Sequence, residues 1–587
     1  MELSLKVYIK KLIMADNAKQ NDFSSPLKRI FRVIQLEKNE ISSVYFYAIL
    51  NGLIQLSLPL GIQSIISFVL GGSITTSLVV LIIFVVSGVF LNGMLQVNQM
   101  RLIEKVQQKI FVRYSFELAD RIPKLDLQAL DGYYLPELVN RFFDTISLQK
   151  GISKLLLDIP TASIQIGFGL ILLSFYHPVF IVFGIFLIVM VYFILRITSP
   201  KGMSSSLKES DYKYAVAGWL QEMARIVKSL KFGKHTTLNI ERTDKLVTGY
   251  LQSRTTHFKV LLLQYWSLIG FKVLITALML VVGSVLLVNQ QLNIGQFIAS
   301  EIIILMVIGS VEKLIINLDK VYDVLTSVEK LGKVTDQPIE QEGNVNLDNR
   351  PEGLTLALNA VNFSYGKPEN RTQAVLKNIN LTINENEKVC IMGRGGSGKS
   401  TLLRLFTGAY KGYTGSLLIN NMPLTNYNLQ SLRSQTGILF GQQDIFEGTL
   451  LENITMGWTG ISAQHILEVA ENIGLKKFIS ELPQGFNTSI DPAGKRLPEK
   501  ITKKILLLRA LINHPRLIML EEPFDGIEEK VKNKIIDYLL TGNPHQTVLV
   551  ISNDPVFAAK CDSVIYMEEG AIKAVGNWKT VQHLIKN

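Results

Sequence analysis

The stretch KVCIMGRGGSGKSTLLRLF, residues 388–406, decides the fold of the C-terminal half of the chain. A short apolar run leads into a glycine-rich segment, and a pattern with helical spacing follows at once. In a strand, loop and helix of this kind, the glycines let backbone N–H groups point at phosphate oxygens. We expect Lys399 to reach the terminal phosphates and Ser400 to bind magnesium. The motif therefore predicts nucleotide binding by Gly393, Arg394, Gly395, Gly396, Ser397, Gly398, Lys399, Ser400 and Thr401.

A second apolar run, LIML at residues 517–520, ends in Glu521 and Glu522. A carboxylate at such a strand end can hold the water shell of a magnesium ion, and the next can polarise an attacking water. Two acids after an apolar strand are also typical of a solvated strand end. Their position downstream of the phosphate loop favours Glu521 as a metal ligand and Glu522 as the catalytic base.

Composition indicates that this soluble part is joined to a membrane part. The chain has 587 residues, of which 48% are hydrophobic and 19% charged, so it is too long for one domain and too apolar to be wholly soluble. Two cysteines exclude a disulfide framework and favour a reducing compartment. The net charge of +11 comes mainly from the apolar half, where basic loops facing anionic lipid explain it, so we expect no nucleic-acid partner.

Six apolar stretches lie in the N-terminal half, each close to the roughly 20 residues that a helix needs to cross a membrane. The connections after the first, third and fifth are short and carry no lysine or arginine, whereas those after the second and fourth are long and rich in both. The long loops and both termini are therefore predicted to be cytoplasmic. We place the spans near residues 44–70, 76–97, 154–176, 178–197, 262–288 and 294–318.

The remaining segments complete a predicted order of four parts. Residues 1–43 form a cytoplasmic segment without a cleavable signal peptide, and residues 24–38 within it form an amphipathic helix that lies on the membrane surface or packs on protein. Residues 44–318 form the membrane domain, 319–352 a charged linker, and 353–587 the soluble domain. The predicted fold class is an all-α six-helix membrane domain followed by an α/β phosphate-loop NTPase domain.

Acidic side chains inside the last predicted span suggest a second site. An acid in a span is costly and usually faces a cavity or a partner, so Glu301 is a candidate for a substrate or ion site. Glu312 lies three turns further along, on a similar face. The alternative is that one or both lie in a helix interface, bonded to hydroxyl groups. Further candidates for lining the same cavity are Asn51, Gln55, Asn92 and Gln96.

From about Ser24 to the C-terminus, the order of these parts resembles an ABC exporter of the type I secretion or peptide and lipid exporter kind. The resemblance implies ATP and Mg²⁺ as ligands, and a half-transporter that pairs with a second copy or a related chain. It implies ATP-driven export of a peptide, protein or lipid-like substrate by alternating access. It also implies a bacterial inner membrane location with the nucleotide-binding domain in the cytoplasm, contact with membrane lipid, and a periplasmic adaptor as a further partner.

Two further site residues are carried over by position from the same family. Tyr365 in VNFSYG resembles the aromatic residue that stacks on adenine. Gln442 in FGQQDIF resembles the glutamine that contacts the metal and senses the membrane domain, with Gln443 as its rival. Glu521 stands where the family has an aspartate, and Glu522 matches the catalytic glutamate.

The chain departs from the family pattern at two places that normally contact the γ-phosphate. Residues 497–501 read LPEKI where the family has LSGGQ, so that Pro498 lacks an N–H group and Glu499 brings a negative charge. Asn553 replaces the switch histidine, and it can donate a hydrogen bond but cannot carry charge. Either hydrolysis is slow, or the contact is rebuilt around Lys500, Lys503 or Lys504. The alternative function is a hydrolysis-impaired regulatory or assembly subunit of a membrane secretion complex.

Overall fold

The structure, a computed structural model, describes residues 28–585 except for 32–34, 36, 73–75, 131–133, 234–236, 367–373, 442 and 495. Its chain forms two compact units. The first comprises Met1–Pro123 and Tyr134–Gln337, and the second comprises Lys124–Tyr133 and Pro338–Asn587. Most of the predicted surface helix at residues 24–38 lies outside the described residues.

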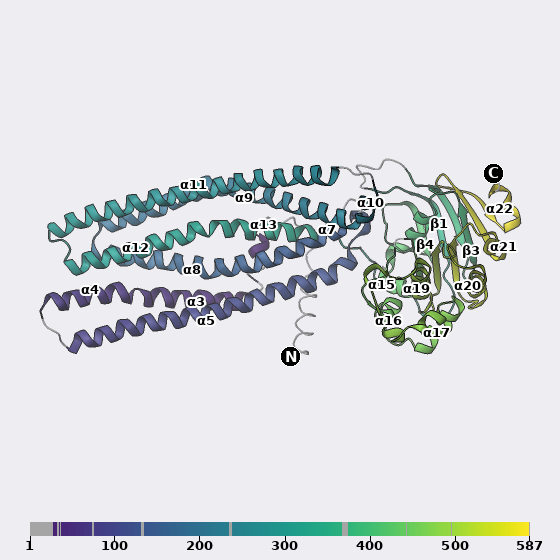
Figure 1. Ribbon diagram of the computed structural model, residues 1–587, viewed down its shortest axis with the longest axis horizontal. Coiled ribbons are helices and arrows are strands. Elements are labelled where there is room, and N and C mark those ends of the chain that lie inside the picture. The colour runs from purple at the N-terminus through teal and green to yellow at the C-terminus, as the bar shows by residue number, and fades with distance from the viewer. Residues whose placement is uncertain are drawn as a thin grey trace. The chain divides into compact units, whose positions relative to one another are not determined.

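Long helices make up the first unit (Figure 1). Six helical runs in the described part of the chain are long and apolar enough to cross a membrane, which confirms the predicted six spans. They extend well beyond the apolar stretches, to Lys38–Leu70, Thr76–Lys124, Leu135–Tyr176, Val179–Arg225, Leu238–Val288 and Ile294–Thr335. The main helices are α3 (Lys38–Gln55), α4 (Ser57–Leu70), α5 (Thr76–Arg121), α8 (Asp144–Tyr176), α9 (Val179–Arg225), α11 (Leu238–Val288), α12 (Ile294–Ile316) and α13 (Leu318–Thr335).

Small residues let these helices approach one another closely. A Cβ atom on Gly169 of α8 would lie 2.6 Å from a methyl group of Val307 on α12, so a larger residue would push the two helices apart. Aliphatic side chains of α8, α9, α11 and α12 fill the core beside this contact. Many other large apolar side chains of the spans are exposed, as expected for surfaces that face lipid.

The predicted linker at residues 319–352 is corrected in its first half, where the chain is helical. Helix α13 continues beyond the sixth span and buries Tyr322, Val324 and Leu331, among others. Its many charged residues suggested a connector, but they alternate with apolar residues at helical spacing and leave one side of the helix apolar. After α13, the chain enters the second unit at Pro338.

Two larger sheets build the second unit. The first is antiparallel, with strand order β2-β1-β4-β5. The second has the order β12-β11-β3-β10-β9-β6, and all of its neighbours are parallel except β12 and β11. The strands are β1 (Leu356–Phe363), β2 (Leu376–Ile383), β3 (Lys388–Gly393), β4 (Thr414–Ile419), β5 (Met422–Pro423), β6 (Thr436–Leu439), β9 (Leu517–Glu521), β10 (Thr547–Ile551), β11 (Ser563–Glu568) and β12 (Ala571–Gly576).

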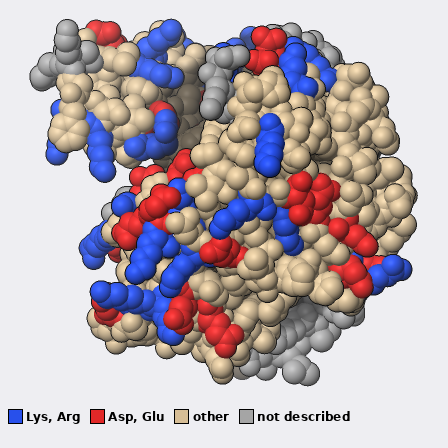
Figure 2. All heavy atoms as spheres, turned by 90° about the vertical axis from the view of Figure 1, so that its right-hand side faces the viewer, with Lys and Arg blue, Asp and Glu red and all other residues tan. Residues whose placement is uncertain are grey.

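The central strands β3 and β10 are buried along their whole length, as the continuous apolar runs predict for strands covered on both faces. Helices pack around the sheets and close two hydrophobic cores. These helices are α14 (Lys399–Phe406), α15 (Leu429–Ser434), α16 (Leu450–Thr455), α17 (Ala463–Asn472), α18 (Lys476–Glu481), α19 (Glu499–Leu511), α20 (Glu529–Thr541), α21 (Pro555–Lys560) and α22 (Trp578–Ile585). On the face shown in Figure 2, acidic and basic side chains are interspersed, which suits a soluble surface.

Candidate functional site

Three neighbouring parallel strands place the candidate site. Strand β10 pairs with β3 on one side and with β9 on the other. The carboxyl ends of parallel strands meet at one edge of a sheet, which is where α/β proteins bind ligands. The phosphate loop follows β3, Glu521 ends β9 and Glu522 comes directly after it, and Asn553 follows β10. The fold therefore brings these three predicted groups to the same edge.

The phosphate loop owes its path to glycine. Gly393, Gly396 and Gly398 have φ angles of 147°, 78° and 94°, a region that residues with a Cβ atom rarely adopt. A Cβ atom on Gly393 would also lie 2.1 Å from the carbonyl oxygen of Met567. Helix α14 begins at Lys399, directly after the loop, so its first backbone N–H groups face the space that the loop encloses.

Lys399 folds back over this loop. Its Nζ donates to the carbonyl oxygens of Gly393 and Arg394, at 2.6 and 2.9 Å, and to Ser397 Oγ at 3.4 Å. Burial lowers the pKa of Lys399, while the nearby charges of the two glutamates act in the opposite direction. The ammonium group is thus held at the rim of the loop, within reach of a phosphate.

Ser400 and Glu521 form the oxygen-rich part of the site. The Ser400 hydroxyl donates to one carboxylate oxygen of Glu521, and the N–H group of Gly441 donates to the other at 3.2 Å. A hydroxyl and a carboxylate are hard oxygen ligands of the type that Mg²⁺ prefers. These two side chains therefore fit the predicted metal-binding role. The extra methylene of glutamate, relative to the family's aspartate, still allows its carboxylate to reach Ser400.

Glu522 has an unusual backbone and a half-buried carboxyl group. Its φ angle is 43°, and its N–H group donates to the carbonyl oxygen of Ile551 on β10 at 2.8 Å. Burial raises the pKa of the Glu522 carboxyl, and the charge of Asp525 raises it further, whereas Lys399 and Lys503 lower it. A carboxyl held in this way suits the role of a general base.

Tyr365 lies beside the start of helix α14, close to the phosphate loop. Its hydroxyl is 3.0 Å from Thr401 Oγ1, and its ring makes edge-to-face contacts with Phe363 and Tyr410, with centroids 5.0 and 5.3 Å apart. Stacking on adenine remains a prediction from the resemblance. The geometry shows that the aromatic residue belongs to the same site as the phosphate loop.

The remaining predicted contacts differ in how the structure places them. Asn553 is exposed, and its Oδ1 accepts a hydrogen bond from the N–H group of Gly393 at 3.4 Å, so it lies against the loop. Gln442 lies outside the described residues. The rival Gln443 uses its own Oε1 to accept from the N–H group of Phe440, at 3.3 Å, and so closes a local turn.

The altered signature begins a helix as the family pattern implies, and its proline precedes the first helical residue, so it removes no N–H group from the helix itself. Pro498 is the N-cap of α19, and its carbonyl oxygen accepts from the N–H group of Ile501 at 2.8 Å. The missing N–H group is therefore that of the cap, and the amides of Glu499 and Lys500 still open the helix. Both side chains are exposed at this end.

Two of the three lysines proposed for a rebuilt phosphate contact are already engaged within their own chain. Lys504 is buried and donates to the carbonyl oxygen of Gly474 at 3.1 Å, which rules against its reaching a nucleotide across a dimer. Lys503 donates to the carbonyl oxygen of Asp525 at 3.1 Å. Lys500 remains as the exposed candidate.

Sequence reasoning missed the contribution of Gly441 and the proximity of Lys503 and Asp525 to Glu522. Gly441 acts through a backbone N–H group, which no side-chain motif reveals. Asp525 lies three residues after Glu522, and this spacing was the available signal for a second acid at the site. Lys503 comes from a helix that precedes β9, so only the fold brings it there.

In the membrane unit, the structure separates the two acids of the last span. Glu312 pairs with Lys272 of α11, so it lies in a helix interface with a cationic partner, as the alternative interpretation held in part. Glu301 Oε2 is buried, and no hydrogen-bond partner for it occurs among the described residues. Of the other candidates, Gln55 accepts from Gln165, which in turn accepts from Ser310 at 2.8 Å.

The hydrogen bonds that the structure describes between Gln55, Gln165 and Ser310 do not include the other three polar candidates, Asn51, Asn92 and Gln96. Asn51 is buried, and neither polar atom of its side chain has a partner among the described residues. Asn92 is partly buried, and Gln96 is exposed. A shared cavity therefore remains a prediction.

Comparison with known families agrees with this arrangement. The family described as ABC transporter transmembrane region matches residues 43–311, and the family described as ABC transporter matches residues 376–525. The first match covers the predicted spans up to residue 311, and the second covers the phosphate loop, both glutamates and the altered signature. The two parts therefore follow one another as in an ABC transporter.

Individual relatives from bacteria are named for the translocation of a hemolysin or a leukotoxin. The alpha-hemolysin translocation ATP-binding protein HlyB of Escherichia coli O157:H7 is 28% identical over 364 residues, which are 62% of this chain and 51% of that protein. The leukotoxin translocation ATP-binding protein LktB of Mannheimia glucosida is 31% identical over 337 residues, 57% of this chain and 46% of that protein. The chain spans about half the length of the curated relatives it matches.

A solved structure extends the likeness in fold to nearly the whole chain. A bacterial Atm1-family ABC exporter with ATP bound superposes with a TM-score of 0.82, covering 93% of this chain and 96% of that one at 17% sequence identity. At this sequence identity the match shows similarity of fold only. Together with the two family matches, it shows that the chain belongs to the ABC transporter family, as an integral multi-pass membrane protein with the fold of an ABC exporter.

Proposed function

We propose that this protein is a half-transporter that uses ATP to export a substrate across a membrane by alternating access. The observation that carries the proposal is the gathering of Lys399, Ser400, Glu521 and Glu522 at one sheet edge, in a chain that also has six spans. Phosphate-binding groups and a candidate base at one edge support hydrolysis, and the spans support its use in transport.

The side chains of this site divide the work on the nucleotide. The loop amides and Lys399 bind and orient the phosphates, and Ser400 with Glu521 would hold Mg²⁺. When bound, the metal ion neutralises charge on the phosphate oxygens. Glu522 accepts a proton from the attacking water, and its partial burial keeps bulk water away from that carboxyl group. In this proposal the ring of Tyr365, whose hydroxyl is 3.0 Å from Thr401 Oγ1, stacks on adenine.

A second protomer completes the site in this proposal. The loop and acids of one copy would face the start of helix α19 of the other, where Glu499 and Lys500 are exposed. The protein would therefore act as a homodimer or with a related chain. The long basic loops favour insertion with the nucleotide-binding domain in the cytoplasm, and we assign the protein to a bacterial inner membrane.

The names of the relatives favour a polypeptide substrate. Both are named for the translocation or export of protein toxins, and we extend that substrate class to this chain, with a periplasmic adaptor as a further partner. Photo-crosslinking from a probe at Glu301, in cells that produce the Glu522→Gln variant, tests this assignment. Crosslinked polypeptide identified by mass spectrometry is the expected result, and crosslinks to lipid alone would contradict it.

ATP hydrolysis by the purified protein in lipid nanodiscs tests the main proposal. We expect magnesium-dependent phosphate release that Glu522→Gln abolishes while nucleotide binding persists. ATP binding without turnover in the wild-type protein would instead favour the regulatory or assembly subunit. The altered signature and Asn553 are the features that make this second outcome worth measuring, although the exporter relatives favour the first.

A further inference from the structure

The turn that follows the phosphate-loop helix contacts Tyr365 of the nucleotide site and the segment Lys124–Tyr133. Thr407 is the C-cap of α14, and Tyr410, three residues later, packs against Tyr365 with ring centroids 5.3 Å apart. Next to it, the N–H group of Gly412 donates to Gln128 Oε1 at 3.2 Å. Gln128 belongs to the short segment Lys124–Tyr133, which is part of the second unit although it interrupts the first in sequence. A displacement of α14 can therefore be passed to that segment through the turn.

Arg433 on α15 connects the same turn to the start of the second unit. Its Nε donates to the carbonyl oxygen of Thr407 at 3.2 Å. Its two terminal nitrogens donate to the two carboxylate oxygens of Glu340, at 2.6 and 2.9 Å. Glu340 is largely buried in this pair, with 13% of its side chain exposed. One guanidinium group thus holds the end of the phosphate-loop helix and a carboxylate together, in the two-pronged geometry that is strongest for arginine.

Glu340 lies where two segments far apart in sequence pair through their backbones. We call residues 338–352 the strap, because they lead from the last membrane helix into the sheets. The N–H group of Glu340 donates to the carbonyl oxygen of Lys124 at 2.7 Å, and that of Asp126 donates to Pro338 at 2.9 Å. Leu125 and Ile339 form an antiparallel bridge between these two bonds. Arg433 therefore holds the strap at the point where the strap holds the segment after α5.

Both segments are continuous with membrane spans. Helix α5 ends at Arg121, three residues before Lys124, and helix α13 ends at Thr335, three residues before the strap. Two of the spans therefore enter the second unit at a single place, next to Glu340. A movement at this place is passed to both spans through covalent bonds.

We propose that the Glu340–Arg433 pair is a positioning contact that makes the second and sixth spans follow the phosphate-loop helix when nucleotide binds. The inference rests on the proposed function and adds the residues that couple its two halves. Nucleotide binds at the N-terminal end of α14. Because Arg433 contacts both the C-terminal end of α14 and Glu340, a displacement of that end moves the strap. Without the pair, nucleotide still binds, but the ends of the two spans respond less.

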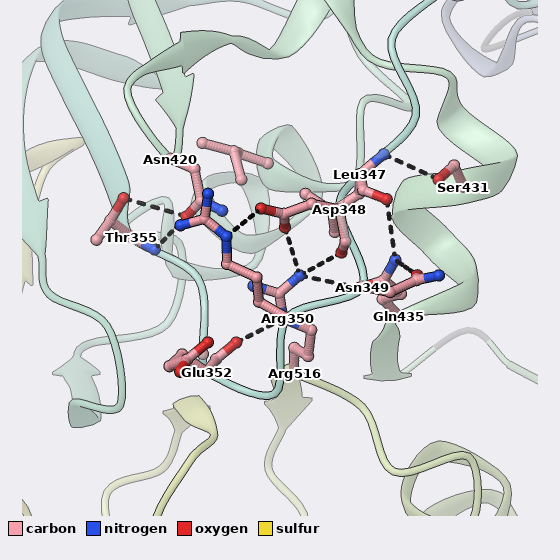
Figure 3. Close-up of polar contacts among 12 residues, drawn as sticks. Leu347, Asp348, Asn349, Arg350, Glu352, Thr355, Asn420, Ser431, Gln435 and Arg516 are labelled. Atoms are coloured by element: carbon pink, nitrogen blue, oxygen red, sulfur yellow. Dashed lines mark hydrogen bonds and ion pairs between the residues drawn. The ribbon is translucent and has the colours of Figure 1, made fainter.

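A separate anchor keeps the strap attached when this pair is broken. Arg516 donates to the carbonyl oxygen and a carboxylate oxygen of Asp348, at 2.6 and 2.9 Å, and to Gln435 Oε1 at 3.1 Å, and also to the carbonyl oxygen of Glu352 (Figure 3). The N–H group of Leu347 donates to Ser431 Oγ at 3.0 Å. Because these contacts lie at the far end of the strap, loss of the Glu340 contact should leave the domain folded.

Hydrogen–deuterium exchange of the full-length protein in lipid nanodiscs tests the inference, with and without the non-hydrolysable analogue AMP-PNP. In the wild-type protein we expect the analogue to change amide exchange at residues 112–130. In Glu340→Gln and in Arg433→Gln we expect that change to fall by at least about half, with analogue affinity kept within about threefold. The charge exchange Glu340→Arg with Arg433→Glu should not restore the response, because a carboxylate at position 433 cannot donate to the carbonyl oxygen of Thr407.

An ion pair on the same unit, away from the strap, provides the matched control. Lys560 and Asp537 are 2.8 Å apart and exposed, so Asp537→Asn should leave the exchange response unchanged. A full response in both single variants would overturn the inference, as would a full response in the charge exchange, because the contact with Thr407 would then be dispensable. Variants that no longer bind the analogue would also overturn it, because the pair would then act on the site itself. A wild-type protein that binds no nucleotide would overturn the proposed function together with the inference.

Discussion

At the scale of single residues, Lys399 offers the most direct test of the nucleotide site. Its ammonium group is held by three oxygen atoms of the loop, and a bound phosphate would replace some of them. Because charge-assisted phosphate contacts contribute roughly 1.5 to 3 kcal/mol, we expect Lys399→Ala to weaken ATP binding at least about tenfold. Equilibrium binding of a fluorescent ATP analogue in nanodiscs measures this. Lys579→Ala, at an exposed lysine, is the charge-matched control, and an unchanged affinity of Lys399→Ala would remove the lysine from the site.

The sequence predicted which residues lie together where a motif fixes both identity and spacing, while the roles of those residues stay predictions. Ser400 and Glu521 are 121 positions apart, and the structure joins them by a hydrogen bond as their assigned roles require. Prediction failed for Lys504, because its neighbours in sequence do not reveal that Gly474 lies within reach of its ammonium group. Side chains that point into a core and side chains that face a partner look alike when only spacing is known.

At the scale of elements, we expect the start of helix α19 to decide how well γ-phosphate is held. If LPEKI is a broken signature, changing Pro498 to Ser, Glu499 to Gly and Lys500 to Gly should raise hydrolysis, because a hydroxyl and unshielded amides would again face the phosphate. We expect this rise, since Glu499 repels phosphate. The measurement is the ATPase rate in nanodiscs for the wild type, the triple variant, and the triple variant with Asn553→His.

The combined variant shows whether the two departures act on one step. A rise seen only when Asn553→His is included would mean that signature and switch act together. A triple variant slower than the wild type would overturn our view, and would indicate that Lys500 has taken over the contact. Lys503 and Lys504 are less suited to that role, because carbonyl oxygens of their own chain already hold them.

The strap also offers a stability prediction at the element scale. Arg516→Ala removes a nearly buried guanidinium, and leaves the carbonyl oxygens of Asp348 and Glu352 without its hydrogen bonds. We expect a loss of about 2 to 4 kcal/mol in the free energy of unfolding of the second unit, since hydrogen bonds from charged donors are worth about 1.5 to 3 kcal/mol each. Thermal unfolding of the full protein in nanodiscs, with a probe on the nucleotide-binding domain, measures it.

Arg350 is the control for this variant. It forms an ion pair with the same residue, Asp348, at 2.9 Å, but its side chain is 76% exposed. Exposed pairs contribute little, so Arg350→Ala should lower the melting temperature much less than Arg516→Ala. Equal effects of the two variants would show that the strap is not held by burial of Arg516.

At the scale of the whole molecule, the six spans and the loop charges predict which parts face which side of the membrane. In a variant whose two native cysteines are replaced, a new cysteine is introduced by Gln290→Cys, in the short turn between α11 and α12, or by Lys228→Cys, between α9 and α11. We expect a membrane-impermeant maleimide to label Gln290→Cys in intact spheroplasts, and Lys228→Cys only after lysis. The reverse pattern would invert the assigned orientation.

The whole fold was more predictable than its internal divisions. Runs of about 20 apolar residues and the strand-loop-helix motif each specify local structure by themselves, so both domains followed from the sequence. The boundary between the two domains did not follow from the sequence. Helix α13 is rich in charged residues, yet one of its sides is buried, and the segment Lys124–Tyr133 belongs to the second unit although the residues before and after it belong to the first. Such choices depend on tertiary contacts such as the bridge between Leu125 and Ile339, which no local pattern encodes.

That displaced segment has a consequence for how the protein is made. The ribosome synthesises Lys124–Tyr133 some two hundred residues before Pro338, with which the backbone of this segment pairs. The segment therefore stays without this pairing while four more spans are synthesised and inserted. The second unit is therefore completed only by reaching back to a piece synthesised early. A gene fragment that encodes residues 338–587 alone would leave Glu340 and Gly412 without the partners that Lys124 and Gln128 supply.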